Sequence, residues 1–301
     1  MTDYDLIVIG AGPAGLLAAM ECKKRGMKHI LVIEKNIVVG GMLNTADYPV
    51  FRDSKKTGKE YAKELVKEFE ASGIETKLST MVLNISPEGN VICTSAEHGV
   101  EAIHARKILL ANGGKEKGRS PLNMPGDRVA GAYSLGTAKM IASEPDLCLG
   151  KNIAIYGTKH LDSIEPLFTS KGIKVGTIIN PKNDSFSFAP ASEALLYNGY
   201  DIAQILGDGR IERLVIKKGL ETIDVKCDTL IFASGWLSDG IVAMRSGIVL
   251  NPETTGPKVD KNYQTSRADI FASGNGIYIH EAMEDIIEEA KAVAAVIKPS
   301  L

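Results

Sequence analysis

The sequence predicts an α/β protein with two nucleotide-binding βαβ units, and two observations support this. The first is the stretch from Tyr4 to Lys35, where a short apolar run, a glycine-rich turn, a helical segment and a second apolar run follow one another. The second is a weaker copy of that order, which begins at Lys151. Short, continuous apolar runs are typical of parallel strands that are buried on both faces.

The first unit has the spacing G-x-G-x-x-G at Gly10, Gly12 and Gly15, between a strand over Leu6–Ile9 and a helix over Pro13–Arg25. The first glycine permits a tight turn, the second lets a pyrophosphate approach the backbone, and the third lets the helix pack against the strand. The N–H groups and the positive dipole end of the helix would face that pyrophosphate.

A second strand, Ile30–Ile33, ends at Glu34, whose carboxylate can accept both ribose hydroxyls of an adenosine. Strand, glycine triplet, helix, strand and terminal acid within about 30 residues form a specific signal for dinucleotide binding. A glycine-rich turn without a ligand is the less favoured interpretation. Glu34 alone does not distinguish FAD from NAD, because both carry the same ribose diol.

Length and composition agree with an ordinary α/β protein. The 301 residues suggest about two domains, and 44% of them are apolar and 24% charged. A net charge of −2 gives no electrostatic reason to expect nucleic acid or an anionic membrane. The N-terminus carries Asp3 and Asp5 and lacks a basic signal-peptide region, and no apolar run approaches the roughly 18 residues of a membrane span. We therefore expect a cytoplasmic protein with no nucleic-acid partner and no membrane span.

The cysteines Cys22, Cys93, Cys148 and Cys227 are widely scattered. None forms a C-x-x-C pair, and no His or Cys cluster has metal-ligand spacing. Buried structural thiols are the favoured interpretation, since free cysteine behaves as a small hydrophobe. We expect no metal site and no disulfide reduction through a vicinal dithiol.

Further elements follow from apolar periodicity and turn residues. Before the second unit we expect a helix over Thr57–Ser72 and strands over Thr76–Ile85, Val91–Thr94, Val100–Ala105 and Lys107–Gly114. The Pro- and Gly-containing segment from Glu116 to Met140 is typical of a crossing between domains. After the second unit we expect strands over Ile202–Leu206, Ile211–Lys217, Cys227–Trp236 and Ile270–Ala272, and a last helix over Glu281–Lys298.

The second unit is expected to keep its fold and to have lost its ligand site. Its elements are a strand over Asn152–Tyr156, a turn at Gly157, a helix over Ser163–Lys171 and a strand over Lys174–Ile179. Lys159 and Asp162 fill the places of the second and third glycines, and Lys159 carries a long side chain where a pyrophosphate would pass. Asn180-Pro181-Lys182 replaces the ribose-binding acid of an NAD site and the arginines of an NADP site. Binding of NAD(P)H is left open.

Three further stretches resemble the FAD domain of the pyridine-nucleotide–disulfide oxidoreductase superfamily, which includes thioredoxin reductase. They are Val39–Leu43 with its glycine pair, the KILLANGG run that ends at Gly114, and Ile270–Ala272 followed by Gly274-Asn275. In that superfamily an acid at the place of Asn275 bonds the flavin's ribityl chain, and a threonine stands where this chain has Asn112.

The resemblance implies FAD as the cofactor and a fold of two Rossmann-like, three-layer ββα domains, the second inserted in the first. The FAD-binding domain would comprise residues 1–114 and 243–301. The inserted NAD(P)-binding-like domain, with its degenerate motif, would comprise residues 115–242. Trp236 would then pack in a core, an interpretation we favour over shielding of the flavin.

Within that superfamily, the sequence resembles in particular the flavoprotein that accompanies glycerol-3-phosphate dehydrogenases. This branch is related to components of sarcosine, proline and opine oxidising complexes. The resemblance is carried by Lys115–Arg119, Pro125–Arg128 with Ala130-Gly131, Cys227–Leu230, Thr255–Pro257, and Gly274-Asn275 with His280. This resemblance implies an FAD-dependent oxidoreductase that relays electrons between a partner or substrate and an acceptor. A dehydrogenase subunit is the implied partner, and homo-oligomerisation is left open.

The resemblance also implies where the flavin is held. Its contacts would come from the glycine turns, the neighbouring strand ends and the start of the last helix, namely Gly10, Gly12, Pro13, Ala14, Gly15, Glu34, Lys35, Gly41, Met42, Val82, Asn112, Gly113, Gly274, Asn275, Glu281 and Ala282. The dipole of the last helix can stabilise a reduced, anionic ring. His280 is the best titratable candidate for a catalytic residue, and a packed or solvent-facing histidine is the alternative.

Two other functions stay open beside the electron relay. One is a non-catalytic FAD-binding subunit of a multi-subunit dehydrogenase, which the degenerate second motif favours. The other is an NAD(P)H-dependent flavin reductase or oxidase, which would need that motif to work.

Overall fold

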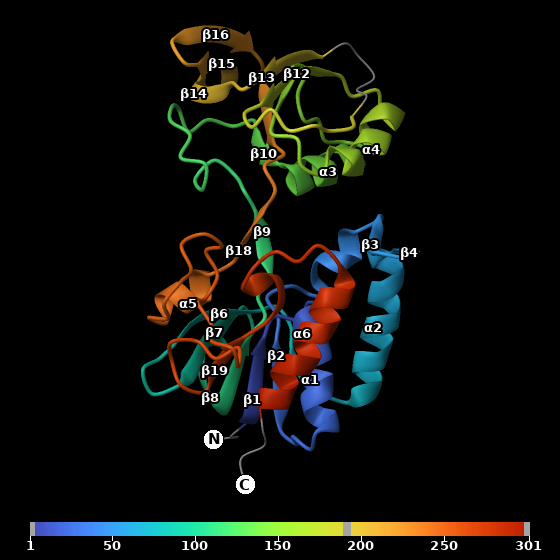
Figure 1. The fold of residues 1–301 in the computed structure, drawn as a ribbon, viewed down its shortest axis with the longest axis vertical. Helices are drawn as coiled ribbons and strands as arrows, with labels where there is room; N and C mark the ends of the chain where they lie inside the picture. The colour runs from blue at the N-terminus through green and yellow to red at the C-terminus, as the bar shows by residue number, and fades with distance from the viewer. Residues whose placement is uncertain (1–3, 189–193, 298–301) are drawn as a thin grey trace. The chain divides into compact units, whose positions relative to one another are not determined.

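The computed structural model describes residues 4–188 and 194–297 (Figure 1). The chain divides into two compact units: unit 1 comprises Met1–Lys115 and Leu237–Leu301, and unit 2 comprises Glu116–Trp236. Unit 2 therefore interrupts unit 1, and β9 (Gly114–Glu116) pairs with β18 (Trp236–Ser238) where the chain crosses twice. We expected Lys115 and residues 237–242 in the inserted domain, but they belong to unit 1, where the Asp239 N–H donates to the carbonyl of Gly113.

Unit 1 is organised around β1 (Tyr4–Ile9), with the strand order β5-β2-β1-β8-β7-β6 and with β19 paired to β8. The other strands are β2 (Ile30–Ile33), β5 (Glu75–Lys77), β6 (Thr80–Ile85), β7 (Asn90–Ser95), β8 (Gly99–Leu110) and β19 (Ile270–Ala272). β1 is parallel to β2 and β8, and β8 is parallel to β19, whereas β6 and β7 run antiparallel. The carboxyl ends of the parallel strands therefore share one edge of the sheet.

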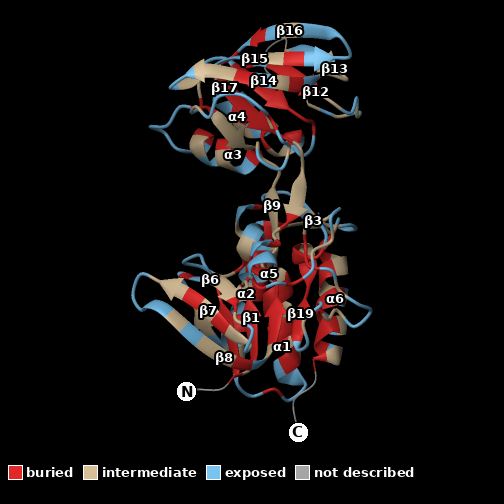
Figure 2. Cartoon of the chain, turned by 90° about the vertical axis from the view of Figure 1, so that its left-hand side faces the viewer, coloured by how far each residue is buried: buried red, intermediate tan, exposed pale blue. Residues whose placement is uncertain are grey.

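Both faces of this sheet are buried, which explains its continuous apolar runs (Figure 2). Leu6 and Val8 face one cluster, built with α1 (Pro13–Lys24), α2 (Gly58–Ser72) and α6 (Met283–Val296). Ile7 and Ile9 face the other, built with β6, β7 and α5 (Ile241–Arg245). Short elements complete the unit: η1 (Gly41–Thr45), β3 (Pro49–Phe51), β4 (Ser54–Thr57) and η3 (Gly274–Gly276).

Unit 2 repeats the same layers. Its parallel sheet has the order β10-β17-β11-β12-β13, with bounds Ala132–Ser134, Thr229–Phe232, Ile153–Tyr156, Val175–Asn180 and Leu195–Asn198. One face packs on α3 (Leu135–Ser143), η2 (Leu161–Ser163) and α4 (Glu165–Ser170). The other packs on an antiparallel sheet of β14 (Asp201–Asp208), β15 (Arg210–Lys218) and β16 (Glu221–Lys226). The expected pair of three-layer ββα folds, the second inserted in the first, is confirmed.

Several predicted boundaries were wrong. The strand expected over 76–85 is broken at Ser79, which has a left-handed φ of 48°, and the strands expected over 100–105 and 107–114 form one strand, β8. The helix expected over 163–171 is reduced to α4, because Pro166 lacks an N–H and fits only the first turn. The last helix begins at Met283, since Ala282 is extended, and Lys298 lies outside the described residues. α3, α5 and β16 were not predicted.

Candidate dinucleotide-binding site

The three glycines of the first turn have two different roles. Gly10 has a φ of 106°, and a Cβ there would lie 2.4 Å from the carbonyl oxygen of Ala111. A Cβ on Gly15 would lie 2.0 Å from the carbonyl oxygen of Gly10. Gly12 differs, because its φ is −79° and no described atom lies within 4 Å of a Cβ built on it. The protein itself needs Gly10 and Gly15, whereas Gly12 leaves open space.

That open space lies at the start of α1. Gly12 is the N-cap, Pro13 occupies the first turn, and no side chain among the described residues caps the helix. The first-turn N–H groups of a helix have no intrahelical acceptor and carry the positive end of the dipole. The start of α1 can therefore bind an anionic group of a ligand.

Two other glycine-containing segments lie against the same turn. A Cβ on Gly41 would lie 2.8 Å from the Cα of Gly12, and a Cβ on Gly274 would lie 2.5 Å from the Cβ of Ala14. A Cβ on Gly276 would lie 3.6 Å from the backbone nitrogen of Gly113. Segments far apart in the sequence therefore form one glycine-lined cradle at the carboxyl edge of the sheet.

Glu34 is held at the end of β2, where the residue is only 5% exposed. Its Oε2 accepts the N–H of Ala11 at 2.8 Å, and its Oε1 accepts the N–H of Asn36 at 2.9 Å. A carboxylate has about four lone-pair sites, so each oxygen can accept one more hydrogen bond. These backbone N–H groups therefore hold the Glu34 carboxylate in place, where it can accept the two hydroxyls of a diol.

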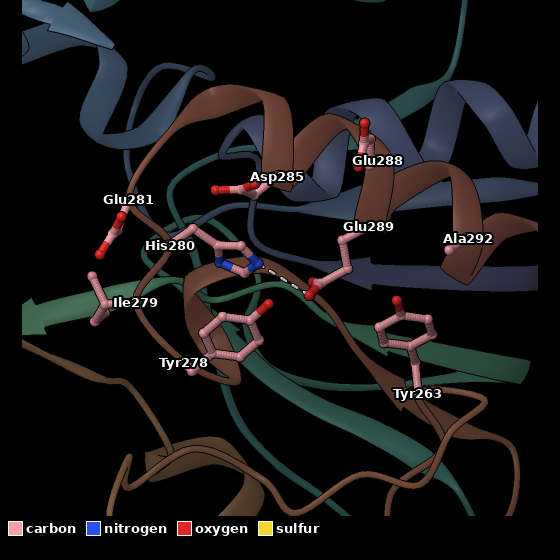
Figure 3. A pocket seen from close by; sticks show the side chains of 9 residues that line it. All are labelled: Tyr263, Tyr278, Ile279, His280, Glu281, Asp285, Glu288, Glu289 and Ala292. Atoms are coloured by element: carbon pink, nitrogen blue, oxygen red, sulfur yellow. Dashed lines mark hydrogen bonds and ion pairs between the residues drawn. The ribbon is translucent and has the colours of Figure 1, made fainter. Parts of the chain in front are cut away.

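A buried polar network ties the Gly274–Asn275 turn to α6, and Figure 3 shows its contact between His280 and Glu289. The Oδ1 of Asn275 accepts the backbone N–H of His280 at 2.9 Å and lies 3.1 Å from its Nδ1. The Nε2 of His280 lies 3.1 Å from the Oε2 of Glu289, whose Oε1 accepts the Ser273 hydroxyl at 3.1 Å and the Gly274 N–H. The side chains of His280 and Glu289 are 1% and 6% exposed.

A cavity of about 600 Å³ lies beside this network, along the face of α6 that carries Asp285, Glu288 and Glu289 (Figure 3). The ring of Tyr278 stacks on His280 with centroids 4.2 Å apart. Burial, and secondarily the charge of Glu289, raises the pKa of Tyr278. A hydrogen bond from Arg52 lowers the pKa of Asp285.

The other residues predicted to contact the flavin differ in their burial and their hydrogen bonds. Val82, a residue of β6, packs in the core, and the Nδ2 of Asn112 donates to the carbonyl of Asp239. Lys35 and Glu281 are exposed, and Met42 is 53% exposed. Ala282 is the buried N-cap of α6.

Sequence reasoning missed Glu289, which organises the network. A signal was present: Glu289 lies at helical spacing with the apolar Ile286, Ala290 and Val293, so a carboxylate stands on the buried face of α6. A buried carboxylate needs hydrogen-bonding partners, and this one has three.

The corresponding turn of unit 2 keeps the first glycine only. Gly157 has a φ of 91°, and a Cβ there would lie 2.4 Å from the carbonyl oxygen of Ala233. Lys159 Nζ lies 3.3 Å from Asp184 Oδ2. The Nδ2 of Asn180, a residue 2% exposed, donates to the carbonyl of Asp184 and to Oδ1 of Asn198, both at 2.9 Å. Lys159 and Asn180, which replace residues of a nucleotide-binding motif, are thus both bonded to Asp184.

The described residues contain no cluster of three or more His, Cys, Asp or Glu side chains that could hold a metal ion. Cys22, Cys93 and Cys227 are buried and Cys148 is exposed. Burial raises the pKa of Cys22 and of Cys227 to about 12. Within residues 4–188 and 194–297, no helix has the length and apolarity to cross a membrane.

Comparison with known proteins identifies the family. Residues 4–158 match the pyridine nucleotide-disulphide oxidoreductase family. One of the subunits of opine oxidase from Rhizobium meliloti is 29% identical over 162 residues, which cover 52% of this chain and 34% of that protein. Thioredoxin reductase of Treponema pallidum is 25% identical, with coverages of 91% and 89%.

The chain therefore spans about a third of the opine oxidase protein that it matches. Among solved structures, bacillithiol disulfide reductase of Bacillus cereus superposes with a TM-score of 0.76 at 20% identity, over 98% of this chain and 99% of that chain. Family members are oxidoreductases that bind FAD and use NAD(P)H as a substrate. With its family match over more than half of its length and the same two-unit fold, this chain belongs to the pyridine nucleotide-disulphide oxidoreductase family.

Proposed function

We propose that this chain is an FAD-dependent oxidoreductase that binds FAD in unit 1 and passes electrons between a partner or substrate and an acceptor. Bound FAD supplies the capacity to accept and release electrons, and the protein supplies position and electrostatics. In this proposal unit 2 is a nicotinamide-type unit whose ligand site has been lost. The sequence has no C-x-x-C pair, so no vicinal dithiol takes part.

The main support for this proposal is the open space beside Gly12. Gly10 and Gly15 are explained by backbone contacts, but nothing in the described protein requires a glycine at Gly12. A pyrophosphate passing across the start of α1 would require one. Glu34, at the end of the next strand, offers its free lone pairs to a ribose. The residues present therefore fit the adenosine diphosphate half of FAD.

The first test is FAD binding by the purified apoprotein, followed through quenching of FAD fluorescence. We expect Gly12→Val to weaken binding more than about 100-fold, because its side chain would fill the space that the diphosphate needs. Its urea unfolding should match that of the wild type, since that space is open and φ is negative. Gly118→Val, also in open space, is the matched control and should bind FAD normally. Wild-type protein that binds no FAD would overturn the proposal.

The second test asks whether nicotinamide reduces the flavin. We expect neither NADH nor NADPH to bleach the flavin absorption rapidly under anaerobic conditions, because Lys159 stands at the place of the second glycine and the Asn180 amide is bonded within the protein. Rapid bleaching by either would instead establish an NAD(P)H-dependent flavin reductase or oxidase.

A dehydrogenase subunit is the partner that we propose, supported by the similarity to one of the subunits of opine oxidase. Copurification from the native source should recover that partner, and its substrate should then bleach the flavin. If the partner copurifies and its substrate leaves the flavin oxidised, the FAD is structural. The lost second site favours this non-catalytic alternative over a nicotinamide-dependent one.

A further inference from the structure

We propose that His280, anchored by Glu289, is a positioning residue that fixes the side-chain amide of Asn275 so that its N–H donors face the cofactor. This inference rests on the proposed function. It changes the chemistry expected at this position, where the superfamily's acid would present only acceptors.

The orientation of the Asn275 amide follows from its contacts. Its oxygen accepts the backbone N–H of His280 at 2.9 Å, and a backbone N–H can only donate. The same oxygen lies 3.1 Å from Nδ1 of His280. A flipped amide would place its NH₂ group against this backbone N–H, which cannot accept. Oδ1 is thus committed to His280, and among the described residues both N–H groups on Nδ2 are left for another acceptor.

His280 is itself fixed from its far side. Its Nε2 faces Oε2 of Glu289 at 3.1 Å, while Nδ1 faces Asn275, so both ring nitrogens meet acceptor oxygens. An N–H on Nδ1 satisfies the contact with Asn275, because the amide oxygen can only accept. Glu289 also accepts hydrogen bonds from Ser273 and Gly274, which fastens the strand that precedes the turn to the same carboxylate.

The turn lies where a cofactor would be held. Gly274 packs against Ala14 at the start of α1, close enough that a Cβ would collide. Asn275 follows directly and is partly exposed, unlike the buried His280 and Glu289 side chains behind it. The ligand chemistry that fits is an acceptor oxygen, from a phosphate or a hydroxyl of FAD.

The test is a double-mutant cycle on FAD affinity. In His280→Gln the new amide can still reach Glu289 from the place of Nε2, but the Nδ1 donor is lost, so we expect FAD to bind about tenfold more weakly. His280→Asn keeps a group at the place of Nδ1 and loses the contact with Glu289, so its affinity for FAD should lie between those of His280→Gln and the wild type. In an Asn275→Ala background, His280→Gln should cause no further loss. The exposed His29→Gln is the control.

Two outcomes would overturn the inference: wild-type affinity in His280→Gln, or effects of His280→Gln and Asn275→Ala that multiply in the double variant. Loss of FAD binding by the wild type itself would instead refute the proposed function, and the inference with it.

A spectrum of wild-type apoprotein gives an independent check. A low-field imidazole N–H proton on Nδ1 should appear by NMR and be absent from His280→Gln, and its absence from the wild type would overturn the assignment.

Discussion

The glycine turns of the two units begin alike and differ two residues later. Gly10 and Gly157 both have a left-handed φ, and a Cβ on either would lie 2.4 Å from a carbonyl oxygen of the neighbouring strand, that of Ala111 or Ala233. Two residues on, unit 1 has the open Gly12 and unit 2 has Lys159, which pairs with Asp184. The glycine that backbone packing requires is present in both units, whereas the open glycine that a pyrophosphate requires is present in unit 1 only.

The ends of the second strands show the same divergence. Glu34 uses one hydrogen bond per oxygen on backbone N–H groups and keeps acceptor capacity. Asn180 at the end of β12 uses its amide on Asp184 and Asn198. At this position unit 2 therefore pairs its polar group within the protein, whereas unit 1 keeps free acceptor capacity.

The largest expected effect tests the shared part of the turns. Gly10→Ala and Gly157→Ala should each lower the free energy of unfolding by about 2–4 kcal/mol, because alanine would be strained at these φ values and its Cβ would collide with backbone. Urea unfolding measures this, with Gly12→Ala as the unstrained control. An unchanged free energy of unfolding in Gly157→Ala would show that the second turn does not require its glycine.

A smaller effect tests the internal pairing in unit 2. Asn180→Asp should cost about 2 kcal/mol of stability, because a carboxylate would face the carbonyl of Asp184 and Oδ1 of Asn198, which are both acceptors. Lys159→Ala should change stability by less than about 1 kcal/mol, since its ion pair is largely exposed. Thermal unfolding compares the two, and NADH binding gained by Asn180→Asp would contradict the internal-pairing account.

A pH-dependent effect concerns two buried thiols, Cys22 in unit 1 and Cys227 in unit 2. Burial raises the pKa of Cys22 and of Cys227 to about 12, above the value near 8.5 expected for the unfolded chain. Between about pH 9 and 12 the unfolded chain binds fewer protons than the folded protein, so stability should fall as pH rises there. Urea midpoints at increasing pH measure this fall. At pH 8 iodoacetamide should label Cys148 alone, and labelling of native Cys22 or Cys227 would contradict the burial.

The sequence predicted those parts of the fold that depend on local pattern. The glycine spacing and the apolar runs located β1, α1, β2 and β11, and Thr57 marked the start of α2, where it forms a capping box with Glu60. α3 lies in a segment whose prolines and glycines are typical of loops, yet Ala138 and Ala142 are buried by tertiary packing. Such packing does not show in a single window of sequence.

The candidate site was predictable to the extent that it is made of glycine turns. His280 was singled out as a titratable residue, but its burial between Asn275 and Glu289 depends on how α6 packs against α1 and η3. No spacing rule joins a turn residue to a carboxylate on the helix that follows it. Glu289 interrupts an otherwise apolar face of α6, and this interruption was the signal that could have identified Glu289 as a site residue.

The discontinuity of unit 1 sets an order of events during protein synthesis. The ribosome delivers all of unit 2 as one uninterrupted segment before it delivers β19, the Gly274–Asn275 turn and α6. Because domains fold as units while the chain emerges, unit 2 can fold while the sheet of unit 1 still lacks β19 and its helical layer still lacks α6. The wall of the cradle that holds Asn275 is therefore made after unit 2, and the cradle stays incomplete until α6 has emerged.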